Sequence, residues 1–147
     1  MSTGTETGRG SDRAIEDMTR VVQLMPNKSQ ATNTLAVLYA LRSHYRAEND
    51  MFPEAAENMT EAIRLKPTAE NYRRRSSCLY HCGKYEMALD DLNVAISKEP
   101  SNPEFYDRRA DCHEKLGQRE QARQDRQRAE SLKQAVPGST DSPASEK

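Results

Sequence analysis

The sequence predicts an all-α protein built as a solenoid of stacked helix-turn-helix units. A pattern of small or apolar residues recurs. Its first two members are 7 positions apart in every copy, and in three copies a proline lies 12 positions after the first member. The copies begin 41, 33 and 34 residues apart, which is typical of stacked helical repeats. Their members are Ala14, Val21 and Pro26; Ala55, Ala62 and Pro67; Ala88, Ala95 and Pro100; and Ala122 with Ala129. This periodicity predicts the architecture more firmly than the function.

Two helices per unit are predicted by two sets of regularly spaced residues. In the downstream helix, Met18, Met59 and Leu92 stand between the repeating small residues and share their helical face. The upstream helix carries a second set, which is Tyr72, Ser76, Leu79 and Gly83 in one copy and Tyr106, Ala110, His113 and Gly117 in the next. Each unit is therefore expected to be two helices joined by a tight turn that contains the glycine.

At these positions the chain resembles the tetratricopeptide repeat family, most fully between Ala69 and Asn102. The matching residues are Tyr72 at the family's aromatic position, Ser76 at its small position, Gly83, Lys84 and Tyr85 at its turn, and Ala88, Leu92, Ala95 and Pro100 in the second helix. Arg75 departs from the pattern, because the family usually has leucine there. The resemblance spans roughly residues 12–134 and implies a right-handed α-solenoid of about three repeats after an N-terminal half repeat.

The chain divides into a repeat domain and two polar tails. The tails, at 1–10 and 135–147, are rich in small polar residues and are expected to be disordered. Within the domain at 11–134, we expect a half repeat at 11–26 and repeats at 27–68, 69–102 and 103–134.

The first full repeat contains seven surplus residues, because the first spacing is 41 instead of 34. Alignment from Pro26 forward brings Tyr39 into register and leaves 43–49 as the surplus. Seven residues are close to two helical turns, so they would lengthen a helix while nearly preserving its face. We therefore expect one long helix from Ser29 to about Glu48, projecting beyond the array at residues 43–49.

The half repeat is expected to be one helix that opens the array without a partner. The residues expected to cover the next helix are Ala14, Met18, Val21 and Met25. Ile15 and Val22 would then face the missing partner and form an exposed stripe. Three explanations remain open at this point: a folded-back cap, a self-association surface, or truncation from a longer array.

Composition and motifs exclude several functional classes. Of the 147 residues 31% are charged, the net charge is -1, and the calculated pI is 6.3. Neither a membrane-spanning run nor a secretion signal is present, so we expect a cytoplasmic protein that binds no membrane. Acidic residues accompany the arginines throughout and no aromatic platform interleaves them, so nucleic-acid binding is not expected.

No catalytic or metal-binding motif is found, so we expect neither an enzyme nor a cofactor. Three cysteines without a framework spacing argue against an oxidised scaffold. Cys78 and Cys112 occupy equivalent places in adjacent repeats, where burial as small packing residues is favoured over zinc binding.

By resemblance to the family, the first helix of each repeat lines a binding groove. Carried over to this chain, the lining residues are Gln30, Asn33, Thr34 and Val37; Glu70, Arg73, Arg74 and Ser77; and Glu104, Asp107, Arg108 and Asp111. Arg74 and Arg108 are equivalent in consecutive repeats, and together they would suit a carboxylate held in bidentate fashion. The alternative is that these arginines are solvated charges balanced by neighbouring acidic residues, which contribute little.

The family's best-known binding mode is a carboxylate clamp for the C-terminal tails of large cytosolic chaperones. Its positions are occupied here by Asn33, Val37, Arg74, Glu104 and Arg108, of which only Arg108 matches. A chaperone co-factor of that type is therefore not expected.

The sequence thus predicts a protein-protein interaction module, an adaptor or scaffold that binds a peptide in its groove. The expected partner is a protein segment with an acidic side chain or a C-terminal carboxylate. The alternative is a self-associating structural unit that forms a homo-oligomer through Ile15 and Val22.

Overall fold

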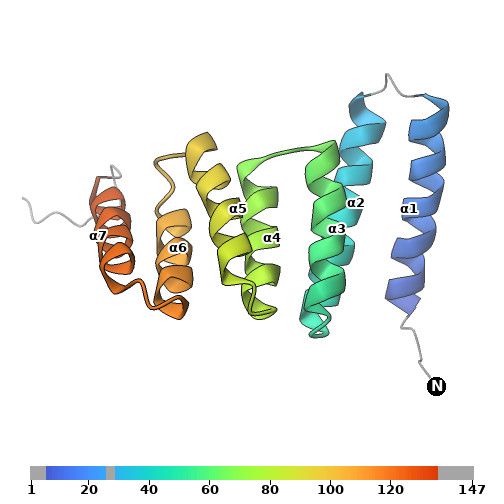
Figure 1. Ribbon diagram of the computed structural model, residues 1–147. Helices are drawn as coiled ribbons and strands as arrows, with labels where there is room; N and C mark the ends of the chain where they lie inside the picture. The colour runs from blue at the N-terminus through green and yellow to red at the C-terminus, as the bar shows by residue number, and fades with distance from the viewer. Residues whose placement is uncertain (1–5, 26–28, 136–147) are drawn as a thin grey trace, which may run out of the picture.

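The protein, seen here in a computed structural model that describes residues 6–25 and 29–135, forms one row of helices. All regular elements in these residues are α-helices, which are α1 (Glu6–Leu24), α2 (Ser29–Glu48), α3 (Phe52–Leu65), α4 (Ala69–His81), α5 (Tyr85–Lys98), α6 (Pro103–Lys115) and α7 (Arg119–Gln134). Figure 1 shows them side by side, each running opposite to the one before it. The prediction of an all-α solenoid of helix-turn-helix units is confirmed.

The repeating alanines form the contact between helices. Ala55, Ala62, Ala88 and Ala95 are completely buried, and Met59 and Leu92 fill the space between them. Small side chains let neighbouring helices approach closely, while one large side chain per helix fills the remaining volume. This alternation is the physical basis of the pattern in the sequence.

Turn residues follow the same period. Gly83 and Gly117, which follow α4 and α6, both have a φ of 74°. The corresponding turn after α2 places Asp50 at a φ of 58°, in the left-handed region that aspartate tolerates better than most residues. At the N-terminus of α4, the Thr68 side chain caps the helix by accepting a hydrogen bond from the Asn71 backbone amide, at 3.2 Å.

The repeat register of α2 is marked by a tyrosine and an arginine that recur in α4. The Arg42 guanidinium lies 5.6 Å from the centroid of the Tyr39 ring, and Arg75 lies 5.8 Å from that of Tyr72. The two tyrosines are 33 residues apart, which is the ordinary repeat spacing. Because α4 begins 3 residues before its tyrosine and α2 begins 10 residues before its own, the seven surplus residues are 29–35.

The expectation that residues 43–49 are the surplus is therefore wrong. Ser43 is buried, and its Oγ donates a hydrogen bond of 2.8 Å to the Ala55 carbonyl oxygen. It thus occupies the small buried position that Ser76 fills in α4. The bounds of α2 are those expected, Ser29–Glu48. The additional turns are at the start of this helix instead of its end, and they rise above the other repeats beside α1 (Figure 1).

Helix α1 begins at Glu6, so the expected disordered tail at 1–10 is wrong for residues 6–10. No proline interrupts this segment, Ser11 donates a hydrogen bond to the Gly8 carbonyl oxygen, and Arg42 of α2 pairs with Asp12. These contacts hold the first turns in place. The rest of the expected tails, at 1–5 and 136–147, lies outside the described residues, as does Pro26.

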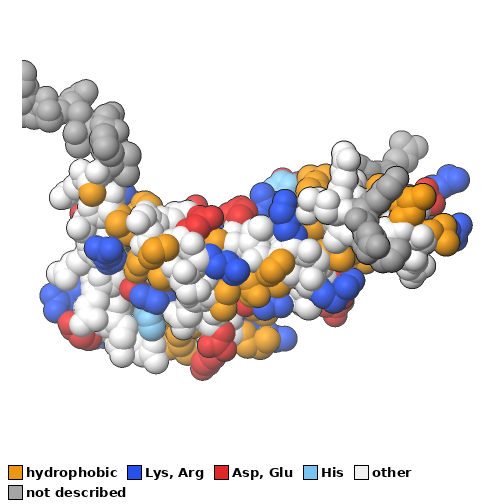
Figure 2. Space-filling model, turned by 90° about the horizontal axis from the view of Figure 1, so that it is seen from above, with side chains coloured by type: hydrophobic (Ala, Val, Ile, Leu, Met, Phe, Trp, Pro, Cys, Tyr) orange, Lys and Arg blue, Asp and Glu red, His pale blue; other side chains and the backbone are white. Residues whose placement is uncertain are grey.

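The orientation of α1 also differs from the expectation. Ile15 is 5% exposed and Val22 is partly buried, so they do not form an exposed stripe. Ile15 is the equivalent of Ala56, which is also buried and lies on the face that α3 turns toward the next repeat. The large exposed apolar residues at this end are Val21, Leu24 and Met25, at 40, 76 and 49%. Figure 2 shows hydrophobic side chains at the α1 end of the molecule.

Candidate functional site

Three adjoining hollows lie along the first helices of the repeats, and we call them together the groove. Two of them lie between α2 and α4, with volumes of about 460 and 280 Å³. The third, of about 180 Å³, lies between α4 and α6. Arg74 lines both of the first two hollows, and Ser77 lines one of these and the third. The hollows therefore follow one another across the first helices and share residues of their walls.

Each first helix presents the same four positions toward the groove side of the array. With the register seen in the structure, these are Val37, Ala40, Leu41 and His44 in α2; Glu70, Arg73, Arg74 and Ser77 in α4; and Glu104, Asp107, Arg108 and Asp111 in α6. The first set is almost wholly apolar, whereas the other two are charged. The groove therefore changes character along its length.

The α2 side of the groove exposes large apolar side chains. Val37 is 52% exposed and Leu41 is 55% exposed, and both line the hollow of about 280 Å³. Met59 and Cys78, which are buried, line the larger hollow. Exposed apolar side chains above an apolar floor favour a ligand that buries an apolar group.

On α4, one glutamate holds two arginines. Glu70 accepts hydrogen bonds from Arg73 at 2.8 and 2.7 Å and from Arg74 Nε at 2.8 Å. These bonds, led by that from Arg73, lower the pKa of Glu70 to about 2, against the opposing effect of its partial burial. The carboxylate is thus charged at neutral pH, and the two guanidinium groups stay in place.

On α6, every acidic groove residue has a basic partner. Glu104 pairs with Arg108 on its own helix at 3.1 Å and with Arg73 across the groove at 3.3 Å. Lys133 and Arg126 of α7 pair with Asp107 at 2.8 Å and with Asp111 at 2.9 Å. These pairs link α4 to α6 and α6 to α7, and they neutralise the acidic end of the groove.

The structure brings most of the predicted site residues together and excludes one. Hollows are lined by Val37, Arg73, Arg74, Ser77, Arg108 and Asp111. Asp107 lies on the same helix as Arg108 but lines none of these hollows. Asn33 was placed in the groove by the alignment from Pro26, and this was wrong, because Asn33 lies in the additional turns of α2.

Sequence reasoning missed Ala40, Leu41 and His44 as groove residues. The signal that could have found them is the motif Tyr-x-x-Arg followed by a small residue. It occurs at Tyr39, Arg42 and Ser43; at Tyr72, Arg75 and Ser76; and at Tyr106, Arg109 and Ala110. Its spacings of 33 and 34 residues give the register that the structure adopts.

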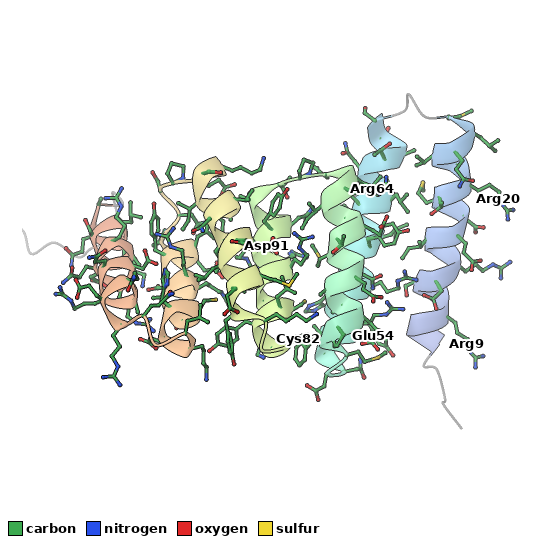
Figure 3. All side chains as sticks on the ribbon, viewed as in Figure 1. Arg9, Arg20, Glu54, Arg64, Cys82 and Asp91 are labelled. Atoms are coloured by element: carbon green, nitrogen blue, oxygen red, sulfur yellow. The ribbon has the colours of Figure 1, made fainter. Side chains whose placement is uncertain are left out.

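The arginine of this motif joins the two helices of each repeat. Arg75 donates two hydrogen bonds to Asp91 of α5, at 2.8 and 2.7 Å, and Arg109 binds Asp125 of α7 with the same distances. Asp91 lies between α4 and α5 (Figure 3). The side chain that departs from the family pattern at Arg75 is therefore part of a partly buried ion pair.

The first repeat uses an amide where the others use a carboxylate. Arg42 donates to Oδ1 of Asn58 at 3.3 and 3.0 Å and also pairs with Asp12 of α1. Asp12 thus supplies the carboxylate that Asn58 lacks, which couples α1 to the first repeat. Asn58 Nδ2 is buried and makes no hydrogen bond within the described part of the chain.

The cysteines belong to no cluster of metal ligands within the described residues. Burial raises the pKa of Cys112 to about 11 and also raises that of Cys78, so both thiols are protonated at neutral pH. Within residues 6–25 and 29–135, no three His, Cys, Asp or Glu side chains are grouped to hold a metal ion. Among the same residues, no helix has the length and apolar character to cross a membrane.

Comparison with known proteins identifies the fold. No model of a known protein family matches the chain. The second tetratricopeptide repeat domain of Spaghetti (RPAP3), in a structure with an HSP90 peptide, superposes with a TM-score of 0.67 at 24% identity, covering 71% of this chain and 98% of that one. The tetratricopeptide repeat domain of Arabidopsis OM64 gives 0.67 at 20% identity, covering 74% and 90%. The protein has the tetratricopeptide repeat fold.

Two further proteins are similar to this chain. MamA superposes with a TM-score of 0.65 at 18% identity, over 91% of this chain and 96% of its own. A DnaJ homolog subfamily C member 7 homolog from Dictyostelium discoideum is 28% identical over 117 residues, which is 73% of this chain. The alignment spans only 22% of that relative's length.

The corrected register also changes the comparison with the carboxylate clamp. Ala40 and His44 replace Asn33 and Val37 at the two clamp positions of the first repeat. Neither is the lysine or asparagine of the clamp, and Arg108 is still the one match. The groove therefore has one of the five clamp residues.

Proposed function

We propose that the protein is a non-enzymatic interaction module, an adaptor or scaffold, whose groove binds a segment of a partner protein. The observation that carries this proposal is the line of adjoining hollows across the first helices, with exposed Leu41 and Arg74 and partly exposed Arg108 on their walls. Apolar contact supplies affinity and guanidinium groups supply specificity for a carboxylate, either a side chain or a chain terminus. The peptide bound to the related RPAP3 domain supports this use of the fold.

The remaining features agree with a module of this kind. Its three cysteines are free thiols, as suits a reducing compartment, and we place it in the cytoplasm. The charged groups near the groove are mostly paired with one another, so nucleic acid is not among the proposed partners.

The double variant Arg74→Glu/Arg108→Glu tests the proposal by capture of partners from a native lysate, quantified by mass spectrometry. Reversing both charges places two carboxylates where the partner's carboxylate would lie, so we expect specific partners to be retained at least about tenfold less. Circular dichroism and thermal unfolding check that the variant is folded.

A matched control is Arg64→Glu/Arg123→Glu, which makes the same change of charge at exposed arginines outside the groove. Each of these pairs with a glutamate three residues earlier, as the groove arginines pair with a glutamate four residues earlier. Arg64 is on α3 (Figure 3). Equal retention by both double variants, or equal loss, would exclude the groove as the binding site.

Self-association is a second candidate function. Its surface would not be formed by Ile15 and Val22, as the sequence suggested, because Ile15 is buried and Val22 is partly buried. Val21, Leu24 and Met25 expose large apolar side chains within five residues at the end of α1. An apolar cluster of this kind suits a symmetric contact between two copies.

Sedimentation velocity over a range of protein concentrations tests this second candidate. If it is correct, the wild-type protein will show a concentration-dependent dimer, and Leu24→Asp will shift the protein to monomer, because a buried carboxylate in the contact is unfavourable. Met87→Asp, at another exposed apolar residue, is the control and should not change the dimer. A monomer in the wild-type protein at the highest concentration would eliminate the candidate.

A further inference from the structure

We infer that the groove selects an internal protein segment that carries an apolar side chain and, about three residues away, an acidic side chain. The apolar side chain would lie in the hollows between α2 and α4, and the carboxylate would bind the free end of Arg74. This inference rests on the proposed function and specifies the chemistry of its partner.

The apolar part of the inference comes from a difference between equivalent positions. The first repeat has Val37 and Leu41 where α4 has Glu70 and Arg74, and α6 has the same glutamate-arginine pair. In α4 and α6 these pairs form ion pairs across one helical turn, whereas Val37 and Leu41 leave more than half of their surface exposed. An apolar side chain of the partner would cover surface that nothing in the described chain covers.

The acidic part comes from the balance of charge at the centre of the groove. Arg73, Arg74 and Arg108 are paired with Glu70 and Glu104, so one positive charge is in excess within this network. Glu70 contacts Arg74 only at Nε. Within the described ranges, no residue forms a hydrogen bond with the two terminal guanidinium nitrogens of Arg74. Those nitrogens have the parallel geometry that binds a carboxylate in bidentate fashion.

The spacing follows from the dimensions of helices and extended chains. Leu41 of α2 and Arg74 of α4 line the same two hollows, so one step along the groove is about the width of a helix with its side chains, about 10 Å. An extended chain advances about 3.3 Å per residue, so this step corresponds to about three residues of ligand. Beyond Arg74 the path continues into the hollow between α4 and α6, so the segment passes Arg74 instead of ending there, which favours an acidic side chain over a C-terminus.

A display library of random twelve-residue peptides, fused at both ends so that no free C-terminus is presented, tests this inference. Selection on the wild-type protein should enrich peptides with a large apolar residue and Asp or Glu about three residues apart. Enriched peptides are then synthesised with blocked ends, and their affinity is measured by fluorescence anisotropy. Changing the acidic residue to its amide should weaken binding at least about tenfold.

The discriminating variant is Val37→Glu/Leu41→Arg, which gives α2 the pair found in α4 and α6. Because the same side chains occupy these helical positions in the other repeats, the variant should fold as the wild type does. We expect it to bind the selected peptides at least about tenfold more weakly and to lose the preference for the apolar residue. The control is Met87→Glu, at an exposed apolar residue on α5 whose equivalent in α3 is Glu54.

Backbone amide chemical-shift changes on peptide binding test this inference and the proposed function separately. Peptides that bind at α2, α4 and α6 but lack the apolar and acidic pair would overturn this inference and leave the proposed function standing. Peptides that bind elsewhere, or a library from which nothing is enriched, would contradict both. Unchanged affinity in Val37→Glu/Leu41→Arg would also overturn the inference.

Discussion

Replacing Asp91 with alanine is expected to lower the free energy of unfolding by about 3 kcal/mol. Asp91 is 5% exposed on its side chain and accepts two hydrogen bonds from Arg75, at 2.8 and 2.7 Å. Its removal leaves the Arg75 guanidinium partly buried without a counter-charge, which costs far more than the net contribution of an intact pair. Urea denaturation followed by circular dichroism measures the effect.

Two further variants show whether the loss comes from the unpaired charge. Glu61→Ala breaks the exposed pair with Arg64 and should cost less than about 1 kcal/mol. The double variant Arg75→Met/Asp91→Leu removes both charges and should recover much of the stability lost in Asp91→Ala. A loss in Asp91→Ala no larger than that in Glu61→Ala would show that the pair is not an effective link between α4 and α5.

The second large effect is expected for Phe105→Ala, with a loss of about 3–5 kcal/mol. Phe105 is 1% exposed and packs against Ala69 and Ala95, so it joins α4, α5 and α6. Truncation leaves a cavity at the junction between the last two repeats. Because each repeat contacts only its neighbours, hydrogen exchange should increase first in α6 and α7.

The control for Phe105→Ala is Met87→Ala, at a residue that is 52% exposed. A surface truncation of this kind should change stability by less than about 0.5 kcal/mol. Equal protection of all helices in Phe105→Ala would show that the array unfolds as one unit, contrary to the expectation for nearest-neighbour stacking.

The structure also explains why α1 belongs to the array although no first helix precedes it in the described residues. Ile15 is buried on α1, which packs against α2, and Asp12 completes the hydrogen bonding of Arg42 in a repeat that has Asn58 in place of aspartate. Apolar burial and a charged contact therefore act on the same helix pair. The exposed residues at the end of α1 lie outside this contact and remain available to a second copy.

Fold and periodicity could be predicted from the sequence because they depend on local properties. Fully buried alanines such as Ala55 and Ala88 recur with the helical period, and Gly83 and Gly117 mark turns that require a positive φ. These constraints act on single residues and their neighbours in the chain, so they are visible without tertiary contacts.

The groove was only partly predictable, because its lining in the first repeat depends on register. Seven residues turn a helix by nearly two full circles, so additions at the start or the end of α2 leave almost the same hydrophobic pattern. Contacts between helices distinguish the two, such as the hydrogen bonds from Ser43 to the Ala55 carbonyl oxygen and from Arg42 to Asn58. In the sequence, the signal for the same register is the Tyr-x-x-Arg motif. The error moved Asn33 into the predicted groove and kept Leu41 out of it.

By itself the sequence determined the helices, their pairing along the chain and the equivalence of Arg74 with Arg108. The tertiary structure decided which face α1 buries, which residues of α2 line the groove, and that Arg75 and Arg109 hold the two helices of a repeat together. The physical reason is that periodicity records which residues point the same way along one helix, whereas burial and ion pairing depend on which helix lies opposite.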